Sequence, residues 1–301
     1  MAGTDADCLV GIGGGSALDT AKAARLIAAH GPIAPFLWPG DPVAVPPLDL
    51  PLVTIPTTAG TGSEVTGGIV LADHERGIKV AAPSPHNRAQ ACLVDPVLTH
   101  RLPPGPTLGG GLDVLSQAIG AITAATRQPV ADAIALEALR LVRDALPAVV
   151  HDGADHAARN RLACASLMAG LAMNLSEAGT DHSLGHALGV RHGIAHGFSV
   201  GVMIAETLEH DRRFVPDRAE RIADALGADP DGSADGSRAV RAVRELLGGI
   251  QCPSLRALGV GDADVVPLTE LALAGWIPVE PGPWSRQDVT AAYRRALAAT
   301  R

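Results

Sequence analysis

The pattern of the sequence changes at Leu102-Pro103-Pro104, and this change limits the fold more than any other feature. Before it, short apolar runs alternate with loops rich in glycine and proline, a pattern typical of a sheet with short strands. From Thr107 onward the chain is rich in Ala and Leu at helical spacing. We therefore predict an α/β domain over residues 1–101, followed by an all-helical domain over residues 102–301.

The apolar runs of the first part predict strands at residues 6–13, 52–55 and 91–94, and a hairpin of residues 65–71 and 78–80. Ser16 is placed to be the N-cap of a helix that ends near Ala29, with Asp19 completing an acidic capping box. The helices expected in the second part span residues 107–125, 129–148, 155–177, 180–189, 196–209, 216–226, 237–248, 264–274 and 285–299.

Composition excludes several classes of protein. Hydrophobic residues make up 47% of the chain and aromatic residues 2%, which predicts a folded protein with an aliphatic core. A net charge of −8 argues against a nucleic-acid partner. We see no apolar run of membrane-spanning length and no signal peptide. The four cysteines form no CxxC pair, so we expect reduced thiols and a cytoplasmic protein.

The segment V-G-I-G-G-G-S-A-L-D-T-A-K, residues 10–22, combines a strand, three glycines and the start of a helix. Backbone N–H groups and the helix dipole favour an anion at such a turn. The spacing is neither GxGxxG nor a P-loop, and a simple strand-to-helix turn is the alternative interpretation. Asp19 and Lys22, at fixed offsets from the glycines, favour the functional interpretation.

The loop I-P-T-T-A-G-T-G-S-E-V-T, residues 55–66, follows a predicted buried strand. Its hydroxyl and amide groups offer many hydrogen-bond donors, which suits a pyrophosphate or a cofactor ribose. Polar loops are common, so the length of this loop and its position after a strand support a cofactor site more than its composition does.

Histidines gather in H-S-L-G-H-A-L-G-V-R-H-G-I-A-H-G. His182 and His186 share one helix face, and His196 lies where the next helix is expected to begin. Two such imidazoles can hold a divalent metal, but chain geometry leaves open which two of the three do so. Asp113 and Gln117 also share a helix face and could add ligands, although Asp113 alone could simply complement a helix dipole.

In this order, the four motifs resemble the iron-containing (group III) alcohol dehydrogenase family, which includes maleylacetate reductases and lactaldehyde reductases. The resemblance covers essentially the whole chain. It implies a dinucleotide-binding α/β domain and a helical metal-binding domain, of dehydroquinate synthase-like architecture, with the active site between them. It also implies NAD or NADP, Fe²⁺ or Zn²⁺, a small alcohol, aldehyde or keto-acid substrate, and a homo-oligomer.

The resemblance assigns expected roles to individual residues. The pyrophosphate would be contacted by Gly13, Gly14, Gly15 and Ser16. The cofactor site would further include Asp19, Thr57, Thr58, Thr61, Ser63 and Lys79. The metal ligands would be Asp113, Gln117, His182 and His196. His186 would lie beside the metal, near the nicotinamide, as a secondary proton carrier.

Two departures from the family pattern keep alternatives open. Gln117 stands where the family usually has histidine, which is a better ligand for Fe²⁺ or Zn²⁺, so a metal-independent maleylacetate reductase type is one alternative. Only twelve residues precede Gly13, so we expect an N-terminally incomplete domain, and a non-catalytic remnant is another alternative. A metal-dependent cyclase is disfavoured because the helical part has no lysine.

Overall fold

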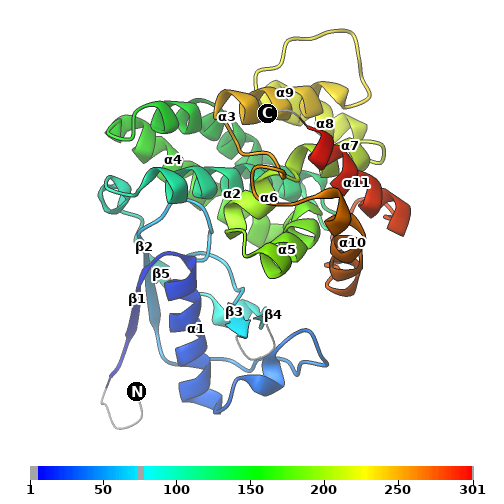
Figure 1. Cartoon of the computed structure of the whole chain (residues 1–301). Coiled ribbons are helices and arrows are strands. Elements are labelled where there is room, and N and C mark those ends of the chain that lie inside the picture. Colours follow the sequence, from blue (N-terminus) through cyan, green and yellow to red (C-terminus); the bar gives the residue numbers. More distant parts are fainter. Residues whose placement is uncertain (1–5, 74–77, 300–301) are drawn as a thin grey trace.

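The computed structural model describes residues 6–73 and 78–299 (Figure 1). Its N-terminal part holds a parallel sheet in the order β1-β2-β5, formed by Leu9–Gly13, Leu52–Pro56 and Ala91–Cys92. Leu9 pairs with Leu52 and Gly13 with Pro56, so the strands β1 and β2 end at the same edge of the sheet. The glycine turn and the threonine-rich loop both leave from that edge.

Helix α1, Gly15–His30, covers one face of this sheet. The predicted N-cap is wrong, because α1 begins one residue before Ser16 and its N-cap is Gly14, without a side-chain hydrogen bond. Asp19 does not complete a capping box, since its carboxylate turns into the protein interior. The turn is therefore built from backbone alone, which leaves the first N–H groups of the helix without a capping side chain.

The predicted hairpin is present, formed by β3, Val70–Asp73, and β4, Ile78–Ala81, in antiparallel pairing. Its first strand begins at Val70, later than expected, and residues 74–77 of the predicted turn lie outside the described residues. Short 3-10 helices in this part are η1, Ala34–Phe36, η2, Pro85–Asn87, and η3, Pro96–Thr99.

The remainder of the described chain is helical, as predicted. The helices are α2, Pro104–Thr123; α3, Pro129–His151; α4, His156–Leu175; α5, Asp181–His192; α6, His196–Gly201; α7, Ile204–Asp211; α8, Pro216–Ala225; α9, Ser237–Gly249; η4, Asp262–Asp264; α10, Val265–Ala274; and α11, Arg286–Ala298. The single helix expected over 196–209 is wrong, because it breaks after Gly201 into α6 and α7. Within the described residues, we find no helix both long and apolar enough to cross a membrane.

Helix α2 lies at the centre of the helical part and packs against α3, α4 and α6. It is buried on all sides from Gly111 to Thr123, as expected for an apolar helix inside a domain. The core around it is mainly Ala, Val, Leu and Ile, as the low aromatic content predicts. The boundary that we propose at residues 101 and 102 falls between η3 and α2.

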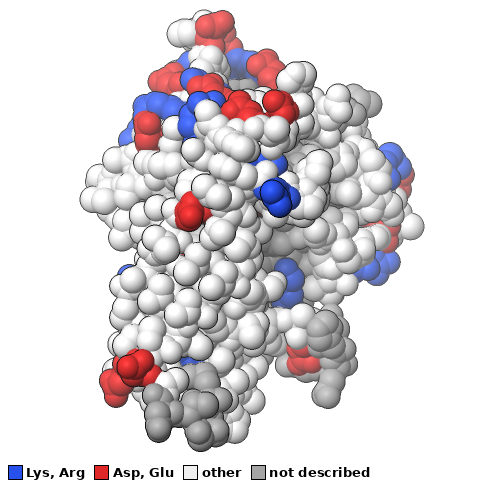
Figure 2. All heavy atoms as spheres, turned by 90° about the vertical axis from the view of Figure 1, so that its left-hand side faces the viewer, with Lys and Arg blue, Asp and Glu red and all other residues white. Residues whose placement is uncertain are grey.

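The face of β1 that points away from α1 is open to solvent among the described residues. Val10 and Ile12 are 51% and 60% exposed. Figure 2 looks onto this side of the molecule and shows a largely uncharged area on its left, with charged side chains above it, below it and along the right-hand edge. The sheet thus has a helix on one face only, and the edge that carries the glycine turn points towards the helical part.

Candidate active site

Three helices bring the predicted metal-binding side chains together. Asp113 lies in the middle of α2, His182 in the first turn of α5, and His196 at the first position of α6. Gly193 ends α5 in the left-handed conformation, with φ +67°, which lets the chain turn back into α6. A Cβ atom at Gly185 would lie 2.9 Å from a side chain of α6, so this glycine lets the two helices approach closely.

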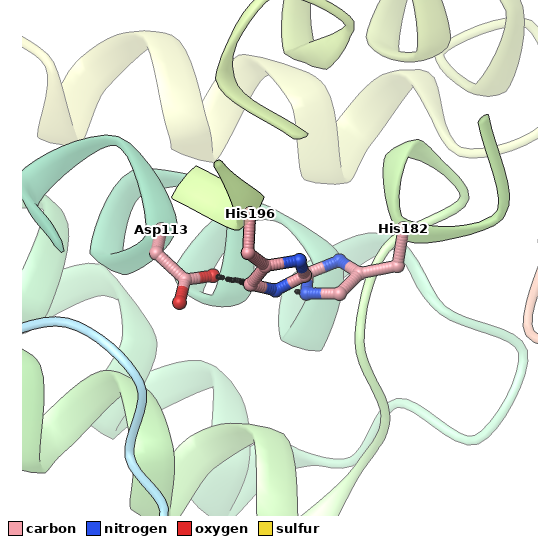
Figure 3. A group of neighbouring side chains, drawn as sticks. All are labelled: Asp113, His182 and His196. Atoms are coloured by element: carbon pink, nitrogen blue, oxygen red, sulfur yellow. Dashed lines mark ion pairs between the residues drawn. The ribbon is translucent and has the colours of Figure 1, made fainter. Parts of the chain in front are cut away.

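The structure selects His182 and His196 as the histidine pair that meets Asp113 (Figure 3). The Nε2 atoms of the two histidines lie 3.8 and 3.7 Å from Asp113 Oδ1, and one ligand atom from each residue falls within 4.8 Å of the others. Ligand atoms about 2.0–2.2 Å from one metal are roughly 3–4 Å apart. Asp113 Oδ1 is buried without a hydrogen-bond partner, which fits a metal ligand.

The ionisable groups of this cluster shift one another's pKa values. Burial raises the pKa of Asp113 to about 6, and the neighbouring His182 opposes this rise. Burial alone would lower the pKa of His182, but contact with Asp181 and the charge of Asp113 raise it. Burial and the charge of His182 lower the pKa of His196 well below its ordinary value, so its imidazole is neutral, as a metal ligand must be.

His186 and Lys79 lie beside the cluster. The His186 ring centre is 6.2 Å from that of His182 and 5.6 Å from that of His196. Burial and the charge of His182 lower the pKa of His186 to about 3, so it is neutral near pH 7. Burial lowers the pKa of Lys79, while the charge of Asp113 raises it. No hydrogen bond joins the Lys79 ammonium to any residue that the structure describes, so it is free to bind a ligand.

Sequence reasoning missed the groups that orient His182. Its Nδ1 atom lies 3.4 Å from Ser116 Oγ and 3.7 Å from Asp181 Oδ1. Ser116 Oγ in turn donates to Asp181 Oδ2. A carboxylate behind a ligating imidazole fixes its ring and tautomer. The adjacency of Asp181 and His182 in the sequence could have indicated this contact, whereas the contribution of Ser116 requires the helix packing.

A second buried carboxylate holds the turn before α5. Asp211 accepts hydrogen bonds from Thr180 Oγ1 at 2.8 Å and from Trp284 Nε1 at 2.8 Å. The His210 Nδ1 atom lies 3.2 Å from Asp211 Oδ1, the oxygen that also accepts from Trp284. Thr180 directly precedes Asp181, so this network fixes the position at which α5 begins.

Gln117 makes contacts that the sequence did not predict. Its amide nitrogen donates to the carbonyl oxygens of Gly60 at 3.1 Å and Thr61 at 3.2 Å. Its oxygen is buried and has no hydrogen-bond partner among the described residues. Gln117 therefore joins α2 to the threonine-rich loop, one helical turn from Asp113. Its role as a metal ligand stays a prediction.

The glycine turn and the threonine-rich loop pack directly against each other. Thr57 N donates to Gly13 O at 2.9 Å. A Cβ atom at Gly14 would lie 3.3 Å from the Thr58 methyl, and one at Gly15 would lie 2.8 Å from the methyl group of a second threonine, Thr61. The two motifs thus form one surface at the start of α1.

Asp19 and Ser63 are occupied within the protein. Lys22, fully buried, donates to Asp19 Oδ1 at 3.2 Å, Ser63 Oγ at 2.9 Å and Gly68 O at 2.8 Å. Ser63 also donates to Asp19, whose second oxygen accepts from Val70 N. This network joins α1, the threonine-rich loop and β3, so these residues support the glycine turn and the threonine-rich loop from behind.

Comparison with known proteins identifies the type of enzyme. The fold, a small parallel α/β part followed by a largely helical part, is that of iron-containing alcohol dehydrogenases. Two family models match: iron-containing alcohol dehydrogenase over residues 1–96, and the C-terminal region of the Fe-containing alcohol dehydrogenase family over residues 107–297. The chain belongs to the iron-containing alcohol dehydrogenase family, an NAD-dependent family of oxidoreductases.

Individual relatives agree with this assignment. The NAD-dependent methanol dehydrogenase of Bacillus methanolicus is 37% identical over 79% of this chain and 62% of its own length. A 1,3-propanediol oxidoreductase structure has a TM-score of 0.90 at 32% identity, covering 96% of this chain and 77% of that one. The maleylacetate reductase of Rhizobium sp. strain MTP-10005 has a TM-score of 0.80 at 29% identity, covering 97% and 75%.

Proposed function

We propose that this chain transfers a hydride between NAD(H) or NADP(H) and a small alcohol or carbonyl compound, assisted by a metal at Asp113, His182 and His196. The observation that carries the proposal is that these three side chains meet and that Asp113 Oδ1 has no hydrogen-bond partner among the described residues. Gln117, one helical turn from Asp113, donates to the threonine-rich loop, which packs on the glycine turn. The relatives, which include an NAD-dependent methanol dehydrogenase, support the reaction class.

Two imidazoles and one carboxylate are a donor set that suits Fe²⁺ with open positions, and also Zn²⁺. A bound divalent metal would act as a Lewis acid on the substrate oxygen, an effect that lowers the pKa of a bound water to about 7. Asp113 and the two histidines would hold it, and Ser116 with Asp181 would keep the His182 ring aligned.

The cofactor would supply or accept the hydride, with its pyrophosphate at Gly13, Gly14, Gly15 and Ser16. The uncapped start of α1 and the facing hydroxyls of Thr58 and Thr61 support this assignment. Lys79, a largely buried ammonium beside the metal cluster, would bind a polar group of the cofactor.

His186 would move a proton to or from the substrate oxygen. It is neutral, makes no hydrogen bond to another described residue, and lies against both ligating histidines. General acid–base catalysis contributes about 10²–10⁴-fold. This is less than the Lewis-acid effect, so loss of His186 should lower the rate by less than loss of the metal.

Turnover of the full chain tests the proposal. Oxidation of NADH and NADPH would be measured with short aldehydes and with maleylacetate, under anaerobic conditions, with Fe²⁺, Zn²⁺ or EDTA. We expect metal-dependent turnover that falls by about a hundredfold in the His196→Ala variant. The His192→Ala variant is the matched control, because His192 lies on α5 outside the cluster. Absence of turnover under every condition would contradict the proposal.

A metal-independent reductase is the second candidate, and Gln117 supports it. The amide of this residue is bound to two carbonyl groups of the threonine-rich loop, where the family usually provides a histidine. This candidate predicts equal turnover with EDTA and with metal, with maleylacetate or a related keto acid as substrate. The non-catalytic alternative predicts that calorimetry detects no binding of NADH or NADPH.

We further propose that the enzyme works in a reducing compartment such as the cytoplasm, because Cys8, Cys92 and Cys164 form no disulfide with a described residue. The homo-oligomer stays a prediction, which light scattering of the purified chain would measure.

A further inference from the structure

A second concave site lies away from the metal cluster, at the amino end of β2. It is an open pocket of about 380 Å³ lined by Arg25, Pro47, Leu48, Pro85, His86, Arg88, Ala89 and Gln90. Gln90 N donates to Leu52 O at the first residue of β2, which places this pocket opposite the edge that carries the glycine turn. Arg25 is ten residues beyond Gly15 in α1, or about 15 Å along the helix axis.

The base of the pocket carries a buried positive charge without a counter-ion. Arg25 is 1% exposed, and its guanidinium donates only to carbonyl oxygens: Arg88 O at 3.0 Å, His86 O at 3.5 Å and Leu48 O at 2.8 Å. Its Nε atom is buried and has no hydrogen-bond partner in the described chain. Burial lowers the pKa of Arg25, and no carboxylate of the described residues compensates its charge.

The rim of the pocket adds two more basic side chains. Arg88 and His86 are exposed, and neither forms an ion pair with any residue that the structure describes. No acidic side chain lines the pocket, although the chain as a whole carries a net charge of −8. Other arginines of the molecule, such as Arg218 and Arg238, pair closely with carboxylates. In this pocket, by contrast, one buried and one exposed arginine lie together with no carboxylate among the lining residues.

The bonds from Arg25 also give the rim a fixed shape. They hold the backbone carbonyls of His86 and Arg88, so the loop that carries both side chains is tied to α1. A pre-formed concave surface with two guanidinium groups and an imidazole matches a group with several acceptor oxygens and two negative charges.

We propose that this pocket binds a phosphate group, either free phosphate or the phosphate of a small metabolite, at a site separate from the cofactor and the metal. Arg88 and His86 contact the phosphate, and Arg25 supplies the positive field beneath it and holds the loop in place. The volume of the pocket leaves room for a small organic group beside the phosphate.

Calorimetry with inorganic phosphate and with glucose 6-phosphate, at constant ionic strength in chloride buffer, tests the proposal. We expect saturable binding to the unmodified chain and a loss of affinity of about tenfold or more in Arg88→Gln. The matched control is Arg101→Gln, which removes the same charge from an exposed arginine that has no ion pair in the described chain. Tighter binding of glucose 6-phosphate would identify a metabolite phosphate as the ligand, and equal binding would identify free phosphate.

Two results would overturn the proposal: no binding to the unmodified chain at millimolar phosphate, or equal affinity in the Arg88→Gln and Arg101→Gln variants. His86→Gln provides a second, independent variant at the rim if Arg88→Gln fails to fold. Phosphate that binds at the glycine turn instead would be insensitive to both pocket variants and would disappear when NADH is present. The calorimetry does not depend on turnover, so a failure of the phosphate-site proposal can be distinguished from a failure of the proposed hydride transfer.

Discussion

Replacement of Asp113 by Asn should stabilise the metal-free protein while abolishing its metal binding. Burial raises the pKa of Asp113 from 3.8 to about 6, a change of about two units. At 1.36 kcal/mol per unit, the ionised carboxylate costs the metal-free fold about 3 kcal/mol above pH 6. Asn has nearly the same shape and no charge, so it removes this cost. The Asp113 carboxylate would thus destabilise the fold whenever no metal is bound.

The pH dependence has a definite sign. Because the folded pKa lies above the unfolded value, the folded state holds its proton more tightly, and stability is lost as pH rises from about 4 to about 6. Above pH 6 the loss is complete. The advantage of Asp113→Asn should therefore be about 3 kcal/mol at pH 8 and about half of that at pH 5. Urea unfolding in EDTA at both pH values measures it.

A matched control is available on the neighbouring helix α3. Asp132 is equally buried, but Arg218 and Arg221 hold it at 2.6 and 2.8 Å. Asp132→Asn should therefore destabilise the fold, by about 1–3 kcal/mol. If Asp113→Asn also destabilises the metal-free protein at pH 8, the Asp113 carboxylate serves the fold and the reasoning is refuted.

Two further variants test the cofactor surface and the support of the metal site. Gly15→Ala should weaken NADH binding, measured by calorimetry, by about tenfold to a hundredfold, because the added Cβ would lie 2.8 Å from the Thr61 methyl. The control is Gly105→Ala, whose added Cβ meets open space and should leave NADH binding unchanged. Ser116→Ala should lower the affinity for Co²⁺ about 10–100-fold, because the His182 ring loses its support. Unchanged Co²⁺ affinity, followed by the absorption spectrum, would show that Ser116 acts only in packing.

Local periodicity was sufficient to predict most of the fold. The Ala- and Leu-rich stretches predicted nearly every helix within a few residues, since each helix must bury one face and the spacing of apolar residues records that face. The error over residues 196–209 has a tertiary cause. Gly197 and Gly201 bring α6 against Gly109 and Leu112 of α2, and the helix ends directly after this crossing.

The candidate site was only partly predictable. The residue types and their order along the chain indicated a metal and a dinucleotide, but the spacing of the three histidines left open which two of them meet Asp113. The choice of His196 depends on the turn at Gly193 and on the packing of α6, which are long-range features. Ser116 was missed for the same reason, because its contact with His182 joins residues far apart in the sequence.

The expected N-cap at Ser16 shows a different error. Ser followed three residues later by an acidic residue is a common start of a helix, but here Asp19 pairs with a buried lysine, Lys22. Burial of that ammonium requires a nearby carboxylate, and this requirement outweighs the gain from a capping box.

Anomalous diffraction from crystals of the full chain grown with Zn²⁺ would locate a metal bound by Asp113, His182 and His196. We predict one strong peak about 2.0–2.2 Å from Asp113 Oδ1 and from the Nε2 atoms of the two histidines. A peak shared by His182 and His186 without Asp113, or no peak in this cluster at saturating metal, would contradict it.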